Sequence, residues 1–294
     1  MGRVLVLGGW GMLGWMVVQV LSQTEGLAVT YTSRDRHTGL FYDIESDQDA
    51  LQQILKQHDR CEYIINCIGV LSSNIDEDNP QSVRRALLVN SLFPYYLADL
   101  AQEFNLRVIH ISTDGVFSGS SPAPYLETTP CDCTDIYGKT KSLGEVRVPN
   151  LLTIRCSIIG PDPIGHKGLL EWFLAQPDNG TVSGYTNHLW NGVTTLQIAE
   201  LCRQLILADV FDVAWKEAPI HHFCPHNPVS KYELLEIFKR VFAKPITVLP
   251  TPSSVAINRV LATQYQTLPR LFGRHLNVEK AIQRLAKAEP KDQI

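Results

Sequence analysis

Residues 4–14 of the chain read VLVLGGWGMLG, and this stretch decides the fold. A short apolar run typical of a buried strand comes first, and a helical pattern follows glycines spaced as Gly8-x-x-Gly11-x-x-Gly14. Glycines at such a strand-to-helix turn let backbone N–H groups approach a pyrophosphate at the helix N-terminus. The pattern therefore predicts a dinucleotide-binding turn. The alternative is that these glycines serve only the packing of the helix on the sheet.

The composition favours a globular, reduced protein. Hydrophobic residues make up 45% of the 294 positions and charged residues 19%, which argues against disorder. The net charge of −4 gives no basic footprint for nucleic acid or for a membrane surface, so we expect neither partner. Residues 4–24 carry no charge and mimic a signal peptide or membrane span, but their glycines interrupt the apolar run. The seven cysteines are scattered without a C-x-x-C pair, which predicts free thiols, a cytoplasmic location and no metal site.

Short apolar runs alternate with helical patterns through the first half of the chain. This alternation predicts an α/β fold, a doubly wound parallel sheet of the Rossmann type. The expected strands are 4–7, 28–32, 41–44, 63–68, 107–112 and 151–155, and the expected helices are 12–22, 47–57, 80–104 and 136–146. Later in the chain we expect helices at 194–207, 230–242 and 278–288 and a strand at 220–223.

The texture of the sequence changes after about residue 159, which predicts a second unit. We expect an NAD(P)-binding Rossmann core at 1–160 with a later returning segment near 185–224. The segments 161–184 and 225–294 would form a smaller, mixed α/β C-terminal lobe that binds the substrate.

Polar side chains follow two of the predicted strands. Ser33 and Arg34 come where an acid would hold a ribose hydroxyl, and an arginine there suits a 2′-phosphate instead. Ser112 and Thr113 end another strand, and ligands of doubly wound sheets lie beyond such strand ends. The alternative for Thr113 is a hydroxyl that caps the following loop.

The stretch YGKTK, residues 137–141, places a phenol and an ammonium four positions apart on a predicted helix. Residues at this spacing are neighbours, with Cβ atoms about 5–6 Å apart. An ammonium that close stabilises a phenolate by about 3 kcal/mol at an effective dielectric constant of ~20. The spacing thus predicts a depressed pKa for Tyr137, about two units below its ordinary value. By itself, the spacing is weak evidence, because such pairs also arise by chance.

These motifs, taken in order, resemble the extended short-chain dehydrogenase/reductases. STDGVFSG, PYLETT, YGKTKSLGE and IRCSIIGP are similar, more narrowly, to motifs of the dTDP-4-dehydrorhamnose reductase family. The resemblance covers most of residues 3–200, and the C-terminal third is looser. It implies a reductase that transfers hydride from NADPH to the C4 ketone of a nucleotide-linked 4-keto-6-deoxy sugar, for surface polysaccharide synthesis. NAD is the alternative cofactor, and a homodimer is an open alternative to a monomer.

The resemblance also implies roles for individual residues. Thr113, Tyr137 and Lys141 would be the catalytic set, with Tyr137 donating a proton to the C4 oxygen and Lys141 holding the nicotinamide ribose. The expected cofactor-binding residues are Gly8, Gly11, Met12, Leu13, Gly14, Ser33, Arg34, Asp43, Ile44, Cys67, Ile68, Gly69, Asn90, Ser157 and Ile158. The expected substrate-binding residues are Gly115, Tyr185, Asn187 and Trp190, with a core packing role as the alternative for Trp190.

Gly115 departs from the family pattern, which has tyrosine at this place, while related 4,6-dehydratases have glutamate. The missing acid or base favours reduction over a dehydratase or epimerase reaction. Two explanations for Gly115 stay open: space for a bulkier sugar such as a UDP-linked 2-acetamido sugar, or a left-handed turn. A non-catalytic NADP-binding regulatory subunit of the same fold is the alternative function. Some relatives join subunits through acidic residues and magnesium, but residues 12–22 carry no carboxylate.

Overall fold

The computed structural model describes residues 2–57, 61–272 and 277–288. Its centre is a seven-stranded sheet in which every neighbouring pair is parallel. The order across the sheet is β11 (Ile220–His222), β6 (Leu151–Cys156), β5 (Arg107–Thr113), β4 (Tyr63–Asn66), β1 (Gly2–Leu7), β2 (Leu27–Ser33) and β3 (Leu40–Phe41). The direction of winding reverses between β1 and β4, where doubly wound sheets bind their ligands. The predicted fold class is confirmed.

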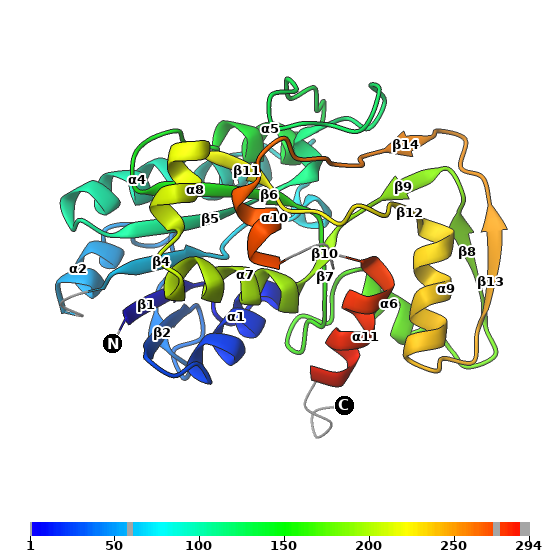
Figure 1. Cartoon of the computed structure of the whole chain (residues 1–294), viewed down its shortest axis with the longest axis horizontal. Helices are drawn as coiled ribbons and strands as arrows, with labels where there is room; N and C mark the ends of the chain where they lie inside the picture. The colour runs from blue at the N-terminus through cyan, green and yellow to red at the C-terminus, as the bar shows by residue number, and fades with distance from the viewer. Residues whose placement is uncertain (1, 58–60, 273–276, 289–294) are drawn as a thin grey trace.

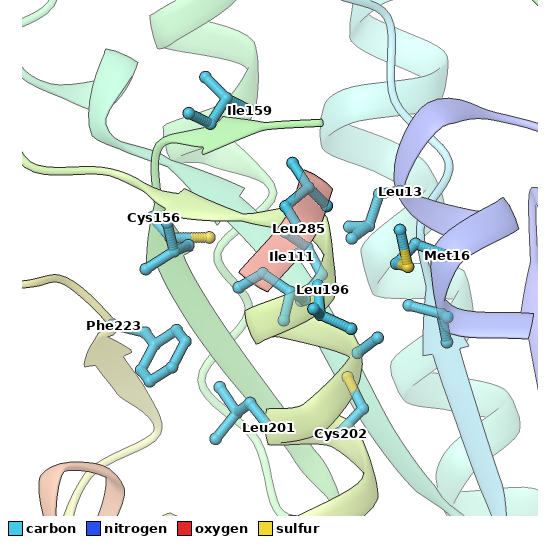
Figure 2. Packing of buried hydrophobic residues seen from close by; sticks show 14 of the residues in the cluster. Leu13, Met16, Ile111, Cys156, Ile159, Leu196, Leu201, Cys202, Phe223 and Leu285 are labelled. Carbon is cyan, nitrogen blue, oxygen red and sulfur yellow. The ribbon is translucent and has the colours of Figure 1, made fainter. Parts of the chain in front are cut away.

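Side chains of β1 alternate between the two faces of this sheet because successive residues of a strand point to opposite sides. Val4 and Val6 belong to a core with α1 (Met12–Ser22) and α7 (Thr195–Leu207). Leu5 and Leu7 belong to a second core, on the face covered by α2 (Ala50–Gln57) and α4 (Phe93–Glu103). Figure 2 shows part of the first core, where Leu13 and Met16 of α1 face Ile111 of β5 and Leu196 of α7. A fully buried leucine contributes about 1.5–3 kcal/mol to stability, so the burial of apolar side chains on both faces stabilises the sheet.

One long helical stretch was predicted at 80–104, and it contains an irregularity. The structure has α3 (Pro80–Ala86), a π-helical segment η2 (Leu87–Leu92) and then α4, without an intervening loop. A π-helical turn inside a helix often lies at a functional site. Here it presents Asn90 toward the strand ends.

The strand β5 leads directly into the segment that carries the candidate chemistry. A short 3₁₀ turn η3 (Asp114–Val116) follows β5, and α5 (Ile136–Leu143) begins twenty residues later. Asp135 caps α5 by accepting a hydrogen bond from the backbone N–H of Gly138 at 2.7 Å. A second 3₁₀ turn, η1 (Ser72–Asn74), follows β4.

The remaining elements form smaller sheets and helices beside the large sheet (Figure 1). The antiparallel pair of β9 (His188–Trp190) with β12 (Val229–Ser230) is extended by β14 (Ile257–Asn258), which runs parallel to β9. The strands β8 (Thr181–Tyr185) and β13 (Thr247–Thr251) pair in parallel, as do β7 (Ile158–Ile159) and β10 (Val193–Thr194). The helices that accompany them are α6 (Leu169–Leu174), α8 (Phe211–Glu217), α9 (Lys231–Val241), α10 (Thr267–Phe272) and α11 (Val278–Ala288).

The chain crosses between these two groups of elements several times. Within the segment expected to return to the core near 185–224, α7 packs on the large sheet and β11 joins it. β9, which also lies in that segment, pairs instead with β12 and β14. The division into two domains with the stated boundaries stays a prediction.

Candidate active site

The glycine turn after β1 has the backbone geometry that its sequence predicts. Gly8 has a φ of +75°, which side chains rarely tolerate, and its N–H donates to Thr32 Oγ1 at 3.1 Å. A Cβ at Gly14 would lie 2.1 Å from the carbonyl oxygen of Gly8, so only glycine lets α1 approach the turn. α1 starts after Gly11 with no side-chain cap and no acidic residue in its first turn. This helix N-terminus is therefore suited to an anion.

A cavity of about 610 Å³ extends from this turn along the carboxyl ends of β2, β4, β5 and β6. Sixteen of the predicted site residues line it: Gly8, Gly11, Met12, Leu13, Ser33, Arg34, Asp43, Ile44, Cys67, Ile68, Gly69, Thr113, Tyr137, Lys141, Ser157 and Ile158. The predicted residues that do not line it are Gly14, Asn90, Gly115, Tyr185, Asn187 and Trp190. The cavity connects the glycine turn with Tyr137, as a site for a dinucleotide would require.

Charged side chains gather at the end of the cavity near β2. Arg34 is exposed and lines the wall, and Asp35 beside it has its Oδ1 engaged with the backbone N–H of His37 at 2.9 Å. Arg85 of α3 also lines the cavity and is ion-paired with Glu45 at 2.7 Å. Arg85 and Glu45 were not predicted, because no motif links α3 to the end of β2.

Thr113, Tyr137 and Lys141 come together at the carboxyl end of β5. The side chains of Thr113 and Tyr137 both lie beside Gly115, and Thr113 Oγ1 accepts a hydrogen bond from the backbone N–H of Gly115 at 3.0 Å. Lys141 is buried and donates from Nζ to the carbonyl oxygen of Ile111 at 2.8 Å. A hydroxyl, a phenol and an ammonium thus face one cavity wall.

The predicted depression of the Tyr137 pKa is wrong for the protein without ligand. The pKa of Tyr137 is raised to about 12, mainly by burial; the nearby Thr113 side chain acts to lower it, and the charge of Asp114 acts to raise it. Lys141 is directed at Ile111 rather than at the phenol, and burial lowers the pKa of Lys141 to about 8. A phenol with this raised pKa is protonated at neutral pH and so carries a proton that it can donate.

Neither explanation for Gly115 is supported. Its φ lies outside the left-handed region, and the residue is buried with no open space beside it. A Cβ there would lie 3.0 Å from Cε1 of Tyr137 and 3.3 Å from Oγ1 of Thr113. The absence of a side chain is what lets the Tyr137 ring lie against this turn.

Asn90 and Trp190 do not line the cavity but support residues that do. Asn90 is fully buried, and its amide bonds the backbone N–H and C=O of Val70 at 2.9 and 3.0 Å. Trp190 is 3% exposed and donates from Nε1 to Ser157 Oγ at 2.7 Å. Its packing role is thus the one that the structure supports.

Tyr185 ends β8, and Asn187 lies in the short turn between β8 and β9. Tyr185 is exposed and its ring lies 4.6 Å from that of His188. Asn187 bonds the backbone N–H and C=O of Ser253 at 2.8 and 2.7 Å, so it fastens two loops together. The structure does not bring either residue to the cavity wall.

Two cations near η3 were missed by sequence reasoning. Lys231 opens α9 with Nζ 5.0 Å from the centre of the Trp190 ring. Arg259 follows β14, and its buried Nε has no hydrogen-bond partner. Burial lowers the pKa of Lys231, while Asp114 raises it and Arg259 lowers it. Only the pairing of β9 with both β12 and β14 places these side chains together, and no motif reports it.

The segment 160–168 forms one wall opposite η1, and its role was not predicted either. Asp162 Oδ1 and Oδ2 accept from the N–H groups of Gly165 and Lys167 at 3.0 and 3.2 Å. Lys167 reaches across the cavity and donates to Asn74 Oδ1 at 3.3 Å.

Comparison with known proteins agrees with this geometry. Residues 2–268 match the model of the RmlD substrate binding domain family. The chain belongs to this family. The RmlD match includes the large sheet and the small sheets alike, and it ends before α11.

Among relatives of this RmlD-family chain, a dTDP-4-dehydrorhamnose reductase from Streptomyces griseus is 33% identical over 271 residues, covering 90% of this chain and 85% of the relative. A dTDP-4-keto-6-deoxy-D-glucose reductase from Streptomyces niveus is 26% identical over 290 residues, covering 90% and 88%. The crystal structure of dTDP-4-dehydrorhamnose reductase from Bacillus anthracis in complex with NADP has a TM-score of 0.78 and 19% identity, covering 98% of this chain and 100% of that one. At that identity the likeness shows the fold. Among the described residues of the RmlD-family chain, no helix is both long and apolar enough to cross a membrane.

Proposed function

We propose that the chain reduces the C4 ketone of a nucleotide-linked 4-keto-6-deoxy sugar with NADPH, in surface polysaccharide synthesis. The observation that carries the proposal is that Thr113, Tyr137 and Lys141 line one cavity, which begins at the glycine turn, with Lys141 one helical turn from Tyr137. The reductases from Streptomyces griseus and Streptomyces niveus support the reaction class.

The cofactor would lie along the glycine turn and supply a hydride. Gly8, Gly11 and the first turn of α1 would hold its pyrophosphate, because Gly8 and Gly14 leave the backbone exposed and no side chain caps the helix. Arg34 would pair with a 2′-phosphate, since a guanidinium matches the geometry of phosphate oxygens. Asn90 would keep the wall at residues 67–70 in place through its two bonds to Val70.

At the sugar, Thr113 and Tyr137 would hydrogen-bond the C4 oxygen. Tyr137 would donate the proton that this oxygen needs as it becomes an alcohol, and the raised pKa of the phenol keeps that proton available at neutral pH. Lys141 would add positive charge where the oxygen becomes negative, which lowers the barrier most in a buried site. Such a positioned general acid typically contributes 10²–10⁴-fold in rate.

The surroundings of Trp190 suit the anionic part of such a substrate. Lys231 and Arg259 lie on either side of β9, near Asp114, and the buried Nε of Arg259 lacks a partner. Because Lys231 and Arg259 lie near the single carboxylate of Asp114, a net positive charge remains there that would attract a diphosphate. This support is independent of the glycine turn, because these residues come from the last third of the chain.

The residues that follow β5 favour reduction over dehydration. Gly115 provides no acid or base, and its neighbour Asp114 is engaged by the hydroxyl of Thr113 at 3.2 Å. The fold itself does not decide the reaction, since a dTDP-glucose 4,6-dehydratase from Bacillus anthracis has a TM-score of 0.72 with 14% identity.

We place this reaction in the cytoplasm because all seven cysteines are free thiols. A homodimer stays a prediction.

The test is oxidation of NADPH by the purified chain against a panel of dTDP- and UDP-linked 4-keto-6-deoxy sugars. The expected result is turnover with at least one of these sugars, and this turnover should depend on Tyr137. A chain that binds NADPH tightly but reduces no sugar in the panel would be the regulatory NADP-binding subunit instead.

A further inference from the structure

A buried carboxylate, Glu145, lies just beyond the end of α5 and makes three strong hydrogen bonds. Arg155 of β6 donates to it from Nε and Nη2 at 2.7 and 2.6 Å, and Ser112 Oγ donates to its Oε1 at 2.7 Å. The side chains of Arg155 and Glu145 are 2% and 4% exposed. A pair this deeply buried is costly to desolvate and is weak evidence for stability by itself.

The position of Glu145 connects it to the catalytic set. It follows Lys141 by four residues, just past Gly144, the C-cap of α5, and its carboxylate is close enough to the Lys141 ammonium to stabilise that charge. Lys141 is bonded to the carbonyl oxygen of Ile111, and Glu145 is bonded to the side chain of Ser112. The same turn therefore holds two successive residues of β5, and the next residue of that strand is Thr113.

Among the described residues, Glu145 is the carboxylate that favours the ammonium form of Lys141. Burial lowers the pKa of Lys141 to about 8, and Glu145 raises it, as does Cys156 on β6 to a smaller degree. His110 on β5 also faces Lys141, and burial together with this lysine holds the pKa of His110 well below its ordinary value, so that it is neutral.

Other elements packed against α5 do not supply such a charge. Asp114 on η3 acts on Tyr137, and of the two arginines on α3, Arg85 is paired with Glu45 while Arg84 is exposed. Glu145 is thus the carboxylate that offsets the burial of Lys141.

We infer that Glu145, fixed by Arg155 and Ser112, is a positioning residue that keeps Lys141 in its ammonium form and holds the end of β5 against Tyr137. The inference rests on the proposed function for the role of Lys141. Arg155 is fixed in turn by the carbonyl oxygen of Glu127 at 3.4 Å and by His222 Nε2 at 3.3 Å.

The experiment measures NADPH affinity by nucleotide fluorescence and kcat/KM by NADPH oxidation, both against pH. In the native protein both should fall as the pH rises through the pKa of Lys141. In Glu145→Gln the loss of the negative charge lowers that pKa, so the alkaline limb should move down by about one pH unit. Glu145→Asp keeps the charge, and its limb should lie within a few tenths of a unit of the native limb.

Thermal denaturation of each variant separates this role from a structural one. Glu145→Gln leaves Arg155 buried without a counter-charge, so the double variant Glu145→Gln/Arg155→Gln, which removes both charges, serves as the second test. A folded Glu145→Gln or a folded double variant with the native alkaline limb would overturn the inference. Failure of both neutral variants to fold would also overturn it, because Glu145 would then serve folding alone. If the native chain reduces no sugar, the proposed function fails, while the NADPH affinity profile still decides the role of Glu145.

Discussion

The hydroxyl of Thr113 and the ring of Tyr137 lie together against Gly115 at the carboxyl end of β5. Two groups that would hydrogen-bond one sugar oxygen are thereby positioned on the same cavity, which reduces the reorganisation needed on binding. Replacing Tyr137 with phenylalanine removes the proton donor and leaves the ring. We expect turnover to fall by roughly 10²–10⁴-fold with NADPH affinity nearly unchanged.

Steady-state kinetics and fluorescence titration of Tyr137→Phe check this expectation. Turnover within threefold of the native value would remove Tyr137 from the mechanism. A large loss of NADPH affinity would instead show that the phenol hydroxyl supports cofactor binding.

Arg34 is predicted to select NADPH over NADH. Its guanidinium lines the cavity, and Asp35, the acid that would favour a free ribose hydroxyl, is engaged with His37. Arg34→Ala should weaken NADPH binding by roughly tenfold or more, since a charge-assisted hydrogen bond contributes about 1.5–3 kcal/mol, and should leave NADH binding nearly unchanged.

Arg36→Ala is the matched control, because the Arg36 guanidinium lies 4.0 Å over the ring of Phe41 and away from the cavity wall. Titration of both cofactors on the three proteins gives the answer. Equal affinity of the native chain for NADH and NADPH would contradict the role of Arg34.

Asn90 is predicted to act on cofactor binding without touching the cavity. Asn90→Ala leaves the N–H and C=O of Val70 and the hydroxyl of Thr140 without their partner. Each unsatisfied buried group costs about 1–3 kcal/mol, so we expect a clear drop in the melting temperature and weaker NADPH binding through the wall at Gly69.

The exposed cap Asn79 offers the comparison for this variant. Asn79→Ala removes the hydrogen bond to Gln81 at the start of α3 and should cost about 1 kcal/mol without any effect on NADPH affinity. Should Asn90→Ala bind NADPH as the native chain does, Asn90 would be a purely structural residue.

The parts of the fold that the sequence predicts are those with a strong local signal. The bounds of α1 and α11 agree with the predicted ones, and the capping box of α9 is present, with Ser230 and Glu233 bonding each other's backbone N–H. β8, β9, β13 and β14 were not predicted. They have two to five residues, and their partners are distant in sequence.

The candidate site shows the same limit. The resemblance to the reductase family predicted sixteen of the residues that line the cavity, because its motifs lie at the glycine turn and at strand ends. The pKa of Tyr137 was predicted in the wrong direction because spacing along a helix shows neither that the phenol is buried nor that Lys141 is bonded to Ile111. Arg155 and Glu145 were not recognised, because their pairing depends on how α5 packs against β6.

The last prediction concerns Gly115, whose would-be Cβ lies 3.0 Å from the ring of Tyr137. If Gly115 existed to make room for an acetamido group, Gly115→Tyr would penalise an acetamido sugar more than a plain 6-deoxy sugar. Because the Tyr137 ring occupies the adjacent space, any side chain must instead displace the proton donor itself. A misplacement of a catalytic group by about 1 Å can cost about 10²-fold in rate.

Gly115→Ala should therefore lower kcat by roughly tenfold, and Gly115→Tyr should lower it further, by the same factor for both sugars. Measurement of kcat/KM for both substrates on the native chain and the two variants gives this result as a ratio. A selective loss of kcat/KM for the acetamido sugar would instead support the explanation that Gly115 makes room for a bulkier sugar. It would also show that Tyr137 tolerates a side chain at this turn.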